Sequence, residues 1–392
     1  MRNLKDVELD GKRVLMRVDF NVPMDKQSNI LDDGKMRGAL PTIEYVLAHN
    51  GKLILMSHLG RPKGKPDPQY SLKGLAPHLQ RLLNGTVVSF AEDCVGPEVE
   101  KKVNNMNLGE VLLLENLRFH PGEEENDDDF SRQLASLGDV YINDAFGTAH
   151  RAHSSTVGVA DYLPAFAGFL MEAEVNMLKS VVESPERPRV AILGGAKVTD
   201  KLGIIENLLE KMDIILIGGG MANTFLKAKG KNVGKSLFEK ELLNEANRLL
   251  DKAEQKKVRL LLPVDVVIAG EISADATATV ARVDEVPDDM MIVDIGPRTI
   301  EIYREEINQA KTIIWNGPMG VYEYEQFAQG SKEITRAMAN ASAVSVIGGG
   351  DSAVIAHDLM LEDKITHIST GGGATLEFLE GIKLPGVAAC GF

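Results

Sequence analysis

The chain has 392 residues, 44% of them hydrophobic and 26% charged, so it can bury ample core, and its length favours two or three domains, of which we expect two. Its formal net charge of −14 argues against nucleic acid or an anionic membrane as a general partner, because both attract mainly Lys and Arg. The sequence has no leading apolar segment and no run of roughly 20 apolar residues, which predicts a cytoplasmic protein without a membrane span. The only cysteines, Cys94 and Cys390, form no CxxC pair, as is usual in a reducing compartment.

Short runs rich in Val, Ile and Leu recur along the chain, and each is followed by a segment with helical spacing. This alternation is typical of βαβ units around a parallel sheet. In the first half, strands are predicted at Arg13–Val18, Lys52–Met56, Glu110–Leu114 and Asp139–Ile142. In the second half, they are predicted at Arg189–Leu193, Asp213–Ile217, Arg259–Val264, Thr312–Trp315, Ala343–Ile347 and Thr366–Ser369.

The two halves are expected to form separate domains joined by a helix. Apolar residues have helical spacing over Phe169–Val182, and the segment SPERP at 184–188 ends the pattern. We therefore predict an α/β fold with two Rossmann-like lobes, each a parallel sheet flanked by helices, joined by an interdomain helix around a cleft. The expected ranges are 1–170 for the N-terminal domain, 171–188 for the helix and linker, and 189–376 for the C-terminal domain.

Charged and polar side chains follow the predicted strands of the first half. They are Asp19, Asn21, Arg37, His58, Arg61, Arg118 and Arg151. Because parallel strands present their carboxyl ends at one edge of a sheet, we expect most of these groups to converge. Converging guanidinium groups suit a small polyanion, and Asp19 and Asn21 would orient its hydroxyl. The acidic run Glu123–Asp129 is interpreted as a solvated loop and helix start.

Glycines follow the predicted strands of the second half, in GGAK at 194, GGGMAN at 218, GGGDSA at 348 and GGGATL at 371. The segment GKNVGKS at 230–236 ends like a Walker A loop, but its first glycine is one residue too close and a helical pattern precedes it. The segment GGGDSA fits a dinucleotide fingerprint, but no acidic residue ends the next strand, which disfavours NAD.

Glycine-rich turns of this kind let a backbone approach phosphate groups, and the exposed N–H groups attract anions. Asp351 could then bind Mg²⁺ beside the hydroxyl of Ser352. In GGAKVTDK, Lys197 and Lys201 are four residues apart, which predicts that they share one face of the first helical turns and serve neighbouring phosphates. Alternatively, both lysines are plain exposed helix residues and Asp351 is an ordinary first-turn residue.

Eight motifs, in order, resemble the phosphoglycerate kinase family along essentially the whole chain. They are VDFNVP at 18–23, SHLGRP at 57–62, LLLENLRFHPGEE at 112–124, INDAFGTAHRAHSST at 142–156, GGAKVTDK at 194–201, GGGMANTFL at 218–226, WNGPMGVYE at 315–323 and GGGDS at 348–352. The resemblance implies a two-lobed enzyme with 3-phosphoglycerate on the N-terminal lobe, nucleotide on the C-terminal lobe, and transfer after the cleft closes. The difference between charged and glycine-rich halves agrees with this division.

The resemblance also implies residue roles. The glycerate would be bound by Asp19, Phe20, Asn21, Arg37, His58, Leu59, Gly60, Arg61, Arg118 and Arg151. The nucleotide would be bound by Gly194, Gly195, Lys201, Gly218, Gly219, Asn316, Glu323, Gly348, Gly349, Gly350, Asp351 and Ser352, with four of these glycines (194, 195, 218 and 219) leaving a flat slot for adenine and Asp351 holding Mg²⁺. Ser352 stands where the family usually has threonine. The segment 377–392 is expected to return to the N-terminal lobe.

The implied reaction is reversible phosphoryl transfer from 1,3-bisphosphoglycerate to ADP, giving 3-phosphoglycerate and ATP, in glycolysis and gluconeogenesis. The acceptor in the ATP-consuming direction is a carboxylate, which is ionised at neutral pH, so no general base is needed. The transition state spreads charge over three oxygens, and we expect Arg37, Lys197 and Mg²⁺ to meet it. A monomer is expected. The alternatives are a non-catalytic two-lobed binding protein and a dehydrogenase.

Overall fold

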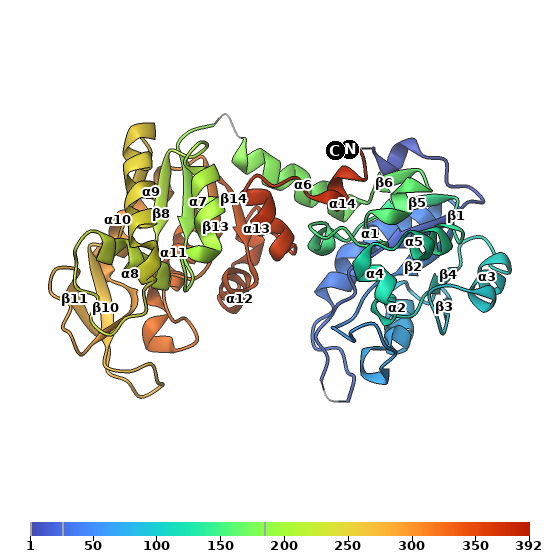
Figure 1. The fold of residues 1–392 in the computed structure, drawn as a ribbon, viewed down its shortest axis with the longest axis horizontal. Coiled ribbons are helices and arrows are strands. Elements are labelled where there is room, and N and C mark those ends of the chain that lie inside the picture. Colours follow the sequence, from blue (N-terminus) through green and yellow to red (C-terminus); the bar gives the residue numbers. More distant parts are fainter. Residues whose placement is uncertain (1, 26, 184–185) are drawn as a thin grey trace. The chain divides into compact units, whose positions relative to one another are not determined.

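The computed structural model describes residues 2–25, 27–183 and 186–392. The chain divides into two compact units, shown in Figure 1: unit 1 is Met1–Val175 with Lys383–Phe392, and unit 2 is Asn176–Ile382. The division falls inside helix α6 (Phe169–Val182), which has the bounds predicted for the connecting helix. Of the predicted helix-ending segment at 184–188, residues 184 and 185 lie outside the described residues.

Unit 1 contains a six-stranded parallel sheet with the order β3-β4-β2-β1-β5-β6. Its strands are β1 (Arg13–Arg17), β2 (Lys52–Met56), β3 (Val88–Phe90), β4 (Val111–Leu113), β5 (Val140–Asn143) and β6 (Ala165–Ala167). The four predicted strands are the four central ones. The edge strands β3 and β6 were not predicted, because their sequences VSF and AFA lack the run of Val, Ile and Leu that marks the equally short β4 (VLL).

Helices cover both faces of this sheet, because successive side chains of a strand point to opposite faces. On one face, Val14 and Met16 pack with helices α1 (Gly34–Ala48) and α2 (Ala76–Leu82). On the other face, Leu15 packs with α3 (Pro97–Asn104) and α5 (Asp128–Ala135). The sheet is therefore a buried layer, and functional groups must lie at the ends of its strands.

The acidic run differs in part from the predicted solvated loop. Glu123 lies on the short helix α4 (Pro121–Glu125) and is fully buried, where its carboxylate accepts hydrogen bonds from Ser155. The residues after it are mostly exposed, and Asp127 caps α5 by accepting from the N–H of Phe130 at 2.8 Å. Burial of Glu123 is compensated by specific partners that sequence spacing could not reveal.

The chain end returns to unit 1 through α14 (Pro385–Ala388). The N–H of Gly386 donates to the carbonyl of Ala149 at 2.8 Å, and the N–H of Arg2 donates to the carbonyl of Cys390 at 2.8 Å, so the two ends lie together (Figure 1). The returning segment begins at Lys383, later than the expected residue 377. Residues 377–382 belong to unit 2, where α13 (Gly373–Leu379) packs against α7 (Leu202–Leu208).

Unit 2 contains a six-stranded parallel sheet, order β15-β14-β13-β7-β8-β9, and a three-stranded antiparallel sheet, order β11-β10-β12. The parallel strands are β7 (Arg189–Leu193), β8 (Ile214–Ile217), β9 (Arg259–Leu261), β13 (Thr312–Asn316), β14 (Val344–Gly348) and β15 (His367–Ile368). The antiparallel strands are β10 (Asp265–Ala269), β11 (Thr279–Arg282) and β12 (Met291–Ile295). All six predicted strands of this half are present.

None of the three antiparallel strands was predicted; β11 is largely exposed and lacks an apolar alternation, whereas β10 and β12 have apolar runs that were not recognised as strands. Strand β9 ends at Leu261 rather than at the predicted Val264, and the intervening Pro263 has no N–H for a ladder. Helices α8 (Gly219–Ala228), α9 (Leu243–Lys256), α10 (Pro297–Gln309), α11 (Gln329–Asn340) and α12 (Gly350–Asp358) complete the unit. Within the described ranges, no helix combines the length and apolar character needed to cross a membrane.

Candidate functional site

Unit 1 has a cavity of about 180 Å³ at the carboxyl ends of its central strands. Its lining residues follow β1, β2, β4 and β5 or begin α1: they are Asp19, Asn21, Lys35, His58, Gly60, Arg61, Arg118, Gly147, Thr148 and Arg151. Seven of these residues were predicted from the sequence, and the structure brings them together. Lys35, Gly147 and Thr148 were not predicted.

Four cations line this cavity, namely Lys35, Arg61, Arg118 and Arg151. The lining carboxylate, Asp19, accepts a hydrogen bond from Lys35 Nζ at 2.9 Å. The cavity is therefore a local positive region in a chain whose net charge is −14. Such a concentration of cations selects a small anionic ligand.

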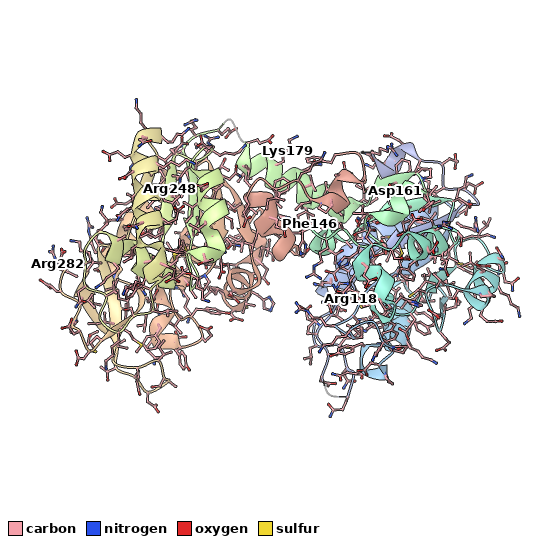
Figure 2. The ribbon with its side chains drawn as sticks, viewed as in Figure 1. Arg118, Phe146, Asp161, Lys179, Arg248 and Arg282 are labelled. Carbon is pink, nitrogen blue, oxygen red and sulfur yellow. The ribbon has the colours of Figure 1, made fainter. Side chains whose placement is uncertain are left out.

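Arg118 (Figure 2) is a buried cation of this lining with two nitrogens that lack hydrogen-bond partners within the described ranges. Its side chain is 4% exposed; Nη1 donates to the carbonyl of Gly60 at 2.9 Å, and Nε lies 3.3 Å from a Glu124 carboxylate oxygen. Nε and Nη2 have no hydrogen-bond partner among the residues that the structure describes. Burial lowers the pKa of Arg118. Because unpaired buried donors are costly, an anion would be stabilised here.

Asp19 and Asn21 form the turn after β1 that faces the cavity. The N–H of Asn21 donates to Asp19 Oδ1 at 3.1 Å, and Asn21 Oδ1 accepts from the N–H of Gly60 at 3.0 Å. Gly60 has a φ of +61°, and a Cβ there would overlap the ring of Tyr70. Glycine is thus required at the point where the loop after β2 meets this turn.

His58 lines the cavity from the end of β2 and is buried. Its Nδ1 lies 3.2 Å from Nη2 of Arg17. Burial, together with the charges of Arg17 and neighbouring cations, holds the pKa of His58 well below its usual range. The imidazole is therefore neutral at physiological pH.

The predicted residues Arg37, Phe20 and Leu59 do not line the cavity. Arg37 is 62% exposed, and its guanidinium pairs with Asp33 at 2.7 Å on the outside of α1. Phe20 and Leu59 are buried in the core of unit 1. The structure thus brings Lys35 to the cavity in place of Arg37.

Helical spacing could have identified Lys35. Ala39 and Ile43 are buried, and Lys35 precedes Ala39 by four residues, so all three lie on one face of α1. Arg37 is offset from that face by two residues, which turns it outward.

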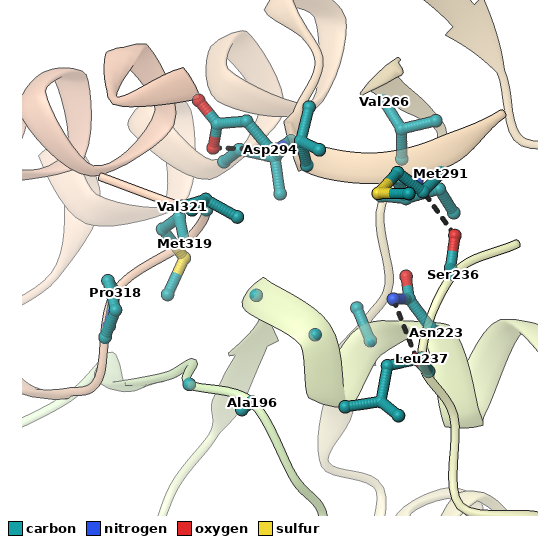
Figure 3. A pocket seen from close by; sticks show the side chains of 18 of the residues that line it. Ala196, Asn223, Ser236, Leu237, Val266, Met291, Asp294, Pro318, Met319 and Val321 are labelled. Carbon is teal, nitrogen blue, oxygen red and sulfur yellow. Dashed lines mark hydrogen bonds between the residues drawn. The ribbon is translucent and has the colours of Figure 1, made fainter. Parts of the chain in front are cut away.

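Unit 2 has a pocket of about 350 Å³, shown in Figure 3. Its walls come from the loop after β7, the start of α8, strand β12 and residues 318–323. Most of the lining side chains are apolar, including Leu226, Leu237, Val266, Ile272, Met291, Pro318, Met319 and Val321. The rim carries Glu323 and Asp351. A mostly apolar pocket with a few polar side chains in its lining suits a ligand with a flat apolar part and a polar part.

Two of the four glycines predicted to form a flat slot line this pocket, namely Gly195 and Gly219. Gly194 and Gly218 lie behind it, where a Cβ would overlap Pro318 and Met319 respectively. Their lack of a side chain lets the loop after β13 pack closely on the ends of β7 and β8. These two glycines shape the pocket without lining it.

Lys197 and Lys201 do not share one helical face, so this prediction was wrong. Residues 194–198 belong to neither helix nor strand, a 3₁₀ helix follows at Thr199–Lys201, and α7 begins at Leu202. The Glu239 carboxylate accepts from the N–H groups of residues 198 and 199, at 2.6 and 3.1 Å, and thereby holds this loop outside a helix. Lys197 is exposed, whereas Lys201 is buried.

The ends of β13 and β14 are tied together beside the pocket. Asn316 Nδ2 donates to the carbonyl of Gly348 at 2.7 Å, and Asn316 Oδ1 accepts from Lys201 Nζ. Ser352 Oγ accepts from the N–H of Gly317 at 3.0 Å. Burial lowers the pKa of Lys201. The amide of Asn316 and the hydroxyl of Ser352 therefore hold the loops that surround the first turn of α12.

The start of α12 offers backbone N–H groups after three successive glycines, Gly348 to Gly350. Asp351 lies in this first turn, is exposed, and accepts a hydrogen bond from Tyr322 Oη at 3.4 Å. Its carboxylate is an oxygen ligand of the type that Mg²⁺ prefers, and a helix start favours anions.

Asp294 also lines the unit 2 pocket and was not predicted. Its carboxylate accepts from the N–H groups of Ile295 at 2.8 Å and Gly330 at 2.7 Å, so it joins β12 to the start of α11. Burial raises the pKa of Asp294 to about 7. A single carboxylate inside an apolar strand carries no sequence signal for this role.

Comparisons with known proteins identify the family of this chain. The family model described as phosphoglycerate kinase matches residues 4–382. The phosphoglycerate kinase of Chloroflexus aggregans is 55% identical over 392 residues, covering 99% of this chain and 98% of the relative. That of Moorella thermoacetica is 56% identical over 386 residues, covering 98% of each chain.

Solved structures show the same relation. The phosphoglycerate kinase structure from Coxiella burnetii has 42% identity and a TM-score of 0.91, covering 99% of this chain and 98% of its own. That from Pyrococcus horikoshii has 35% identity and a TM-score of 0.82, covering 100% and 98%. The chain belongs to the phosphoglycerate kinase family, whose enzymes reversibly transfer a phosphoryl group from 1,3-bisphosphoglycerate to ADP to give 3-phosphoglycerate and ATP.

Proposed function

We propose that the unit 1 cavity binds 3-phosphoglycerate and 1,3-bisphosphoglycerate. The observation that carries this proposal is the convergence of four cations on one small cavity with a carboxylate and an amide beside them. Arg61, Arg118 and Arg151 would bind the carboxylate and phosphate oxygens bidentately or singly. Asp19 and Asn21 would orient the hydroxyl of the glycerate.

The unit 2 pocket would hold ADP or ATP. Its apolar walls suit the adenine ring, and Glu323 at the rim would accept hydrogen bonds from the ribose hydroxyls. The phosphate chain would lie at the start of α12, over Gly348–Ser352, within reach of the cation of Lys201. Asp351 fits a magnesium ligand, because Mg²⁺ is commonly held by one or two carboxylates and the substrate phosphates. When bound, Mg²⁺ neutralises charge on the transferring phosphate.

Electrostatic stabilisation carries the chemistry in this proposal. The acceptor carboxylate is ionised, so the protein needs no base and must instead stabilise charge spreading over the phosphoryl oxygens. Lys35 from unit 1 takes the role that the sequence had given to Arg37, because Lys35 lines the cavity. Lys197 from unit 2 is the second cation. Because different units bind the two ligands, domain closure is part of the proposal.

The direct test is a coupled assay of ATP formation from 1,3-bisphosphoglycerate and ADP, with and without Mg²⁺. Turnover that requires both substrates and falls when Mg²⁺ is chelated is expected. Binding of both ligands without turnover would indicate a two-lobed binding protein instead. A rise in melting temperature with NADH and none with ADP would favour a dehydrogenase.

The cell compartment and the assembly complete the proposal. A cytoplasmic monomer fits a chain with two buried cysteines, and light scattering of the purified protein tests the monomer. A dimer mass would contradict it.

A further inference from the structure

Behind the unit 1 cavity lies a chain of buried polar groups that phosphoryl transfer does not itself use. Arg17, at the end of β1, is 1% exposed, and Ser155 and Glu123 are also buried. Arg17 Nε donates to Ser155 Oγ at 2.8 Å, and that hydroxyl donates to Glu123 Oε1 at 2.6 Å. The N–H of Ser155 donates to Glu123 Oε2 at 3.0 Å. One serine thus bridges a buried guanidinium and a buried carboxylate.

The other end of this chain reaches His58. Arg17 Nη2 lies 3.2 Å from His58 Nδ1. An arginine offers only donors, so Nδ1 must accept, and the proton of the neutral ring is then on Nε2. In the described part of the chain, Nε2 has no hydrogen-bond partner, and the ring lines the cavity.

We propose that Arg17, held by Ser155 and Glu123, is a positioning residue that fixes His58 as its neutral Nε2–H tautomer, ready to donate to an anionic ligand oxygen. The proposal rests on the assignment of 3-phosphoglycerate to this cavity. Carboxylate and phosphate oxygens accept hydrogen bonds, so an Nε2–H group directed at these oxygens attracts the ligand. The opposite tautomer would present a nitrogen lone pair to the same oxygens and repel them.

Glu123 is needed because a buried guanidinium without a counter-charge is strongly destabilising. The charged groups that act on His58 are Arg17, Arg118, Lys35 and Arg151, and Asp19 also lines its cavity. Burial and these cations together disfavour the imidazolium. The ring therefore contributes direction, through its tautomer, and the surrounding cations contribute charge.

Nitrogen-15 NMR of the histidine side chains of the ligand-free protein tests the tautomer, with the His58 signal assigned by its loss in His58→Gln. Wild type is expected to show the Nε2–H tautomer from about pH 6 to about pH 8. In Ser155→Ala, Arg17 keeps the hydrogen bond from Nη1 to the carbonyl of Val18 but loses the one that holds Nε, and a mixture of tautomers is expected. The KM for 3-phosphoglycerate should rise about tenfold, the effect of one hydrogen bond to a charged group, while the KM for ATP stays unchanged.

The matched control is Ser154→Ala. This neighbouring buried hydroxyl donates to the carbonyls of Gly122 and Asp127, at 2.9 and 3.2 Å, and makes no hydrogen bond to the Arg17 or Glu123 side chains. This substitution should leave both the tautomer and the KM for 3-phosphoglycerate unchanged. An Nδ1–H tautomer or an imidazolium in wild type at neutral pH would overturn the proposal, and the wild-type spectrum gives this result even if Ser155→Ala does not fold. An unchanged spectrum and an unchanged KM in folded Ser155→Ala would also overturn it. Because the spectrum needs no ligand, failure of 3-phosphoglycerate to bind wild type would count against the assigned substrate separately.

Discussion

Lys35 and Arg37 lie two residues apart on α1 in different surroundings. Lys35 lines the cavity, whereas Arg37 lies outside it and forms an ion pair with Asp33. Lys35→Ala should lower kcat/KM for 3-phosphoglycerate by about 10²-fold or more, because a cation at the reacting anion is lost. Arg37→Ala should lower it by less than about threefold, because an exposed ion pair contributes little. Steady-state kinetics of both variants measure these values of kcat/KM. A larger loss in Arg37→Ala than in Lys35→Ala would show that Arg37 is the cation that stabilises the reacting anion.

Lys197 has an exposed place in the loop after β7. Lys197→Ala is expected to lower kcat by at least about 10²-fold with a modest change in KM, since it would act mainly on the transition state. Lys240→Ala, at another exposed lysine of unit 2, is the control and should leave kcat unchanged. A wild-type kcat in Lys197→Ala would remove this residue from the mechanism.

Asp144 predicts how the stability of unit 1 depends on pH. It accepts from the N–H of Leu170 at 2.9 Å at the start of α6, and burial raises its pKa to about 7. Between the ordinary aspartate pKa of about 4 and about 7, the folded state keeps a proton that the unfolded state has released. The free energy of unfolding should therefore fall as pH rises through this window, by at most about 1.4 kcal/mol per pH unit from this group.

Urea unfolding at about pH 5 and about pH 7 measures this effect. In Asp144→Asn the difference between the two pH values should shrink, because the titrating group is gone. Asp161→Asn, at an exposed position of the same unit (Figure 2), should behave as wild type. An equal pH dependence in Asp144→Asn and wild type would show that another group is responsible.

Among the individual residues, the sequence identified those that lie just after the carboxyl ends of predicted strands. Asp19, His58 and Arg118 each come directly after a strand or one short turn later, so their meeting follows from parallel topology. The role of Glu123 could not be predicted, because its partner Ser155 is 32 residues away and the pairing depends on the packed interior. The relation of Lys197 to Lys201 also depends on a distant residue, Glu239.

Among the elements, α12 depends on the glycine that precedes it. Gly349 has a φ of +101°, and a Cβ there would come within 3.0 Å of Asn316 Nδ2. Gly349→Ala should destabilise unit 2 by about 1–3 kcal/mol, the usual effect of a strained backbone, and weaken ADP binding. Gly350→Ala is the control for stability, because its Cβ would meet nothing within 4 Å and alanine favours helix. Thermal unfolding compares them, and equal melting temperatures would refute the strain argument.

The elements that could be predicted are those with a strong apolar run and a clear ending. The strands around β1 and β7 meet that condition, and so does α6. Strand β11 of the antiparallel sheet does not, because its side chains are mostly exposed and its pairing with β10 is set by tertiary contacts. Strands β10 and β12 do have apolar runs, but these were not recognised as strands. Sequence patterns therefore indicated the two parallel sheets and missed the sheet that supplies β12 to the unit 2 pocket.

At the scale of the whole molecule, the reactivity of the two cysteine thiols measures the opening of unit 1 alone. Cys94 and Cys390 both belong to unit 1 and both are buried. Burial raises the pKa of Cys94 well above its usual range and that of Cys390 to about 12. Both should react with a thiol reagent only when unit 1 opens.

A ligand that binds unit 1 should slow this labelling. At a concentration of 100 times Kd, 3-phosphoglycerate should slow it about 100-fold, equivalent to about 2.7 kcal/mol. ADP, proposed to bind unit 2, should slow it much less. Labelling of Cys94→Ser and Cys390→Ser measures each thiol separately, and protection by ADP equal to that by 3-phosphoglycerate would contradict the assignment of the two sites.

The return of Lys383–Phe392 to unit 1 affects the order of assembly during synthesis. The ribosome makes all of unit 2 before it makes the segment whose Gly386 and Cys390 bond to the first unit. Unit 2 is continuous in the chain and can fold as it emerges, whereas unit 1 lacks its final helix until after that. The part of the protein that begins first is therefore completed last.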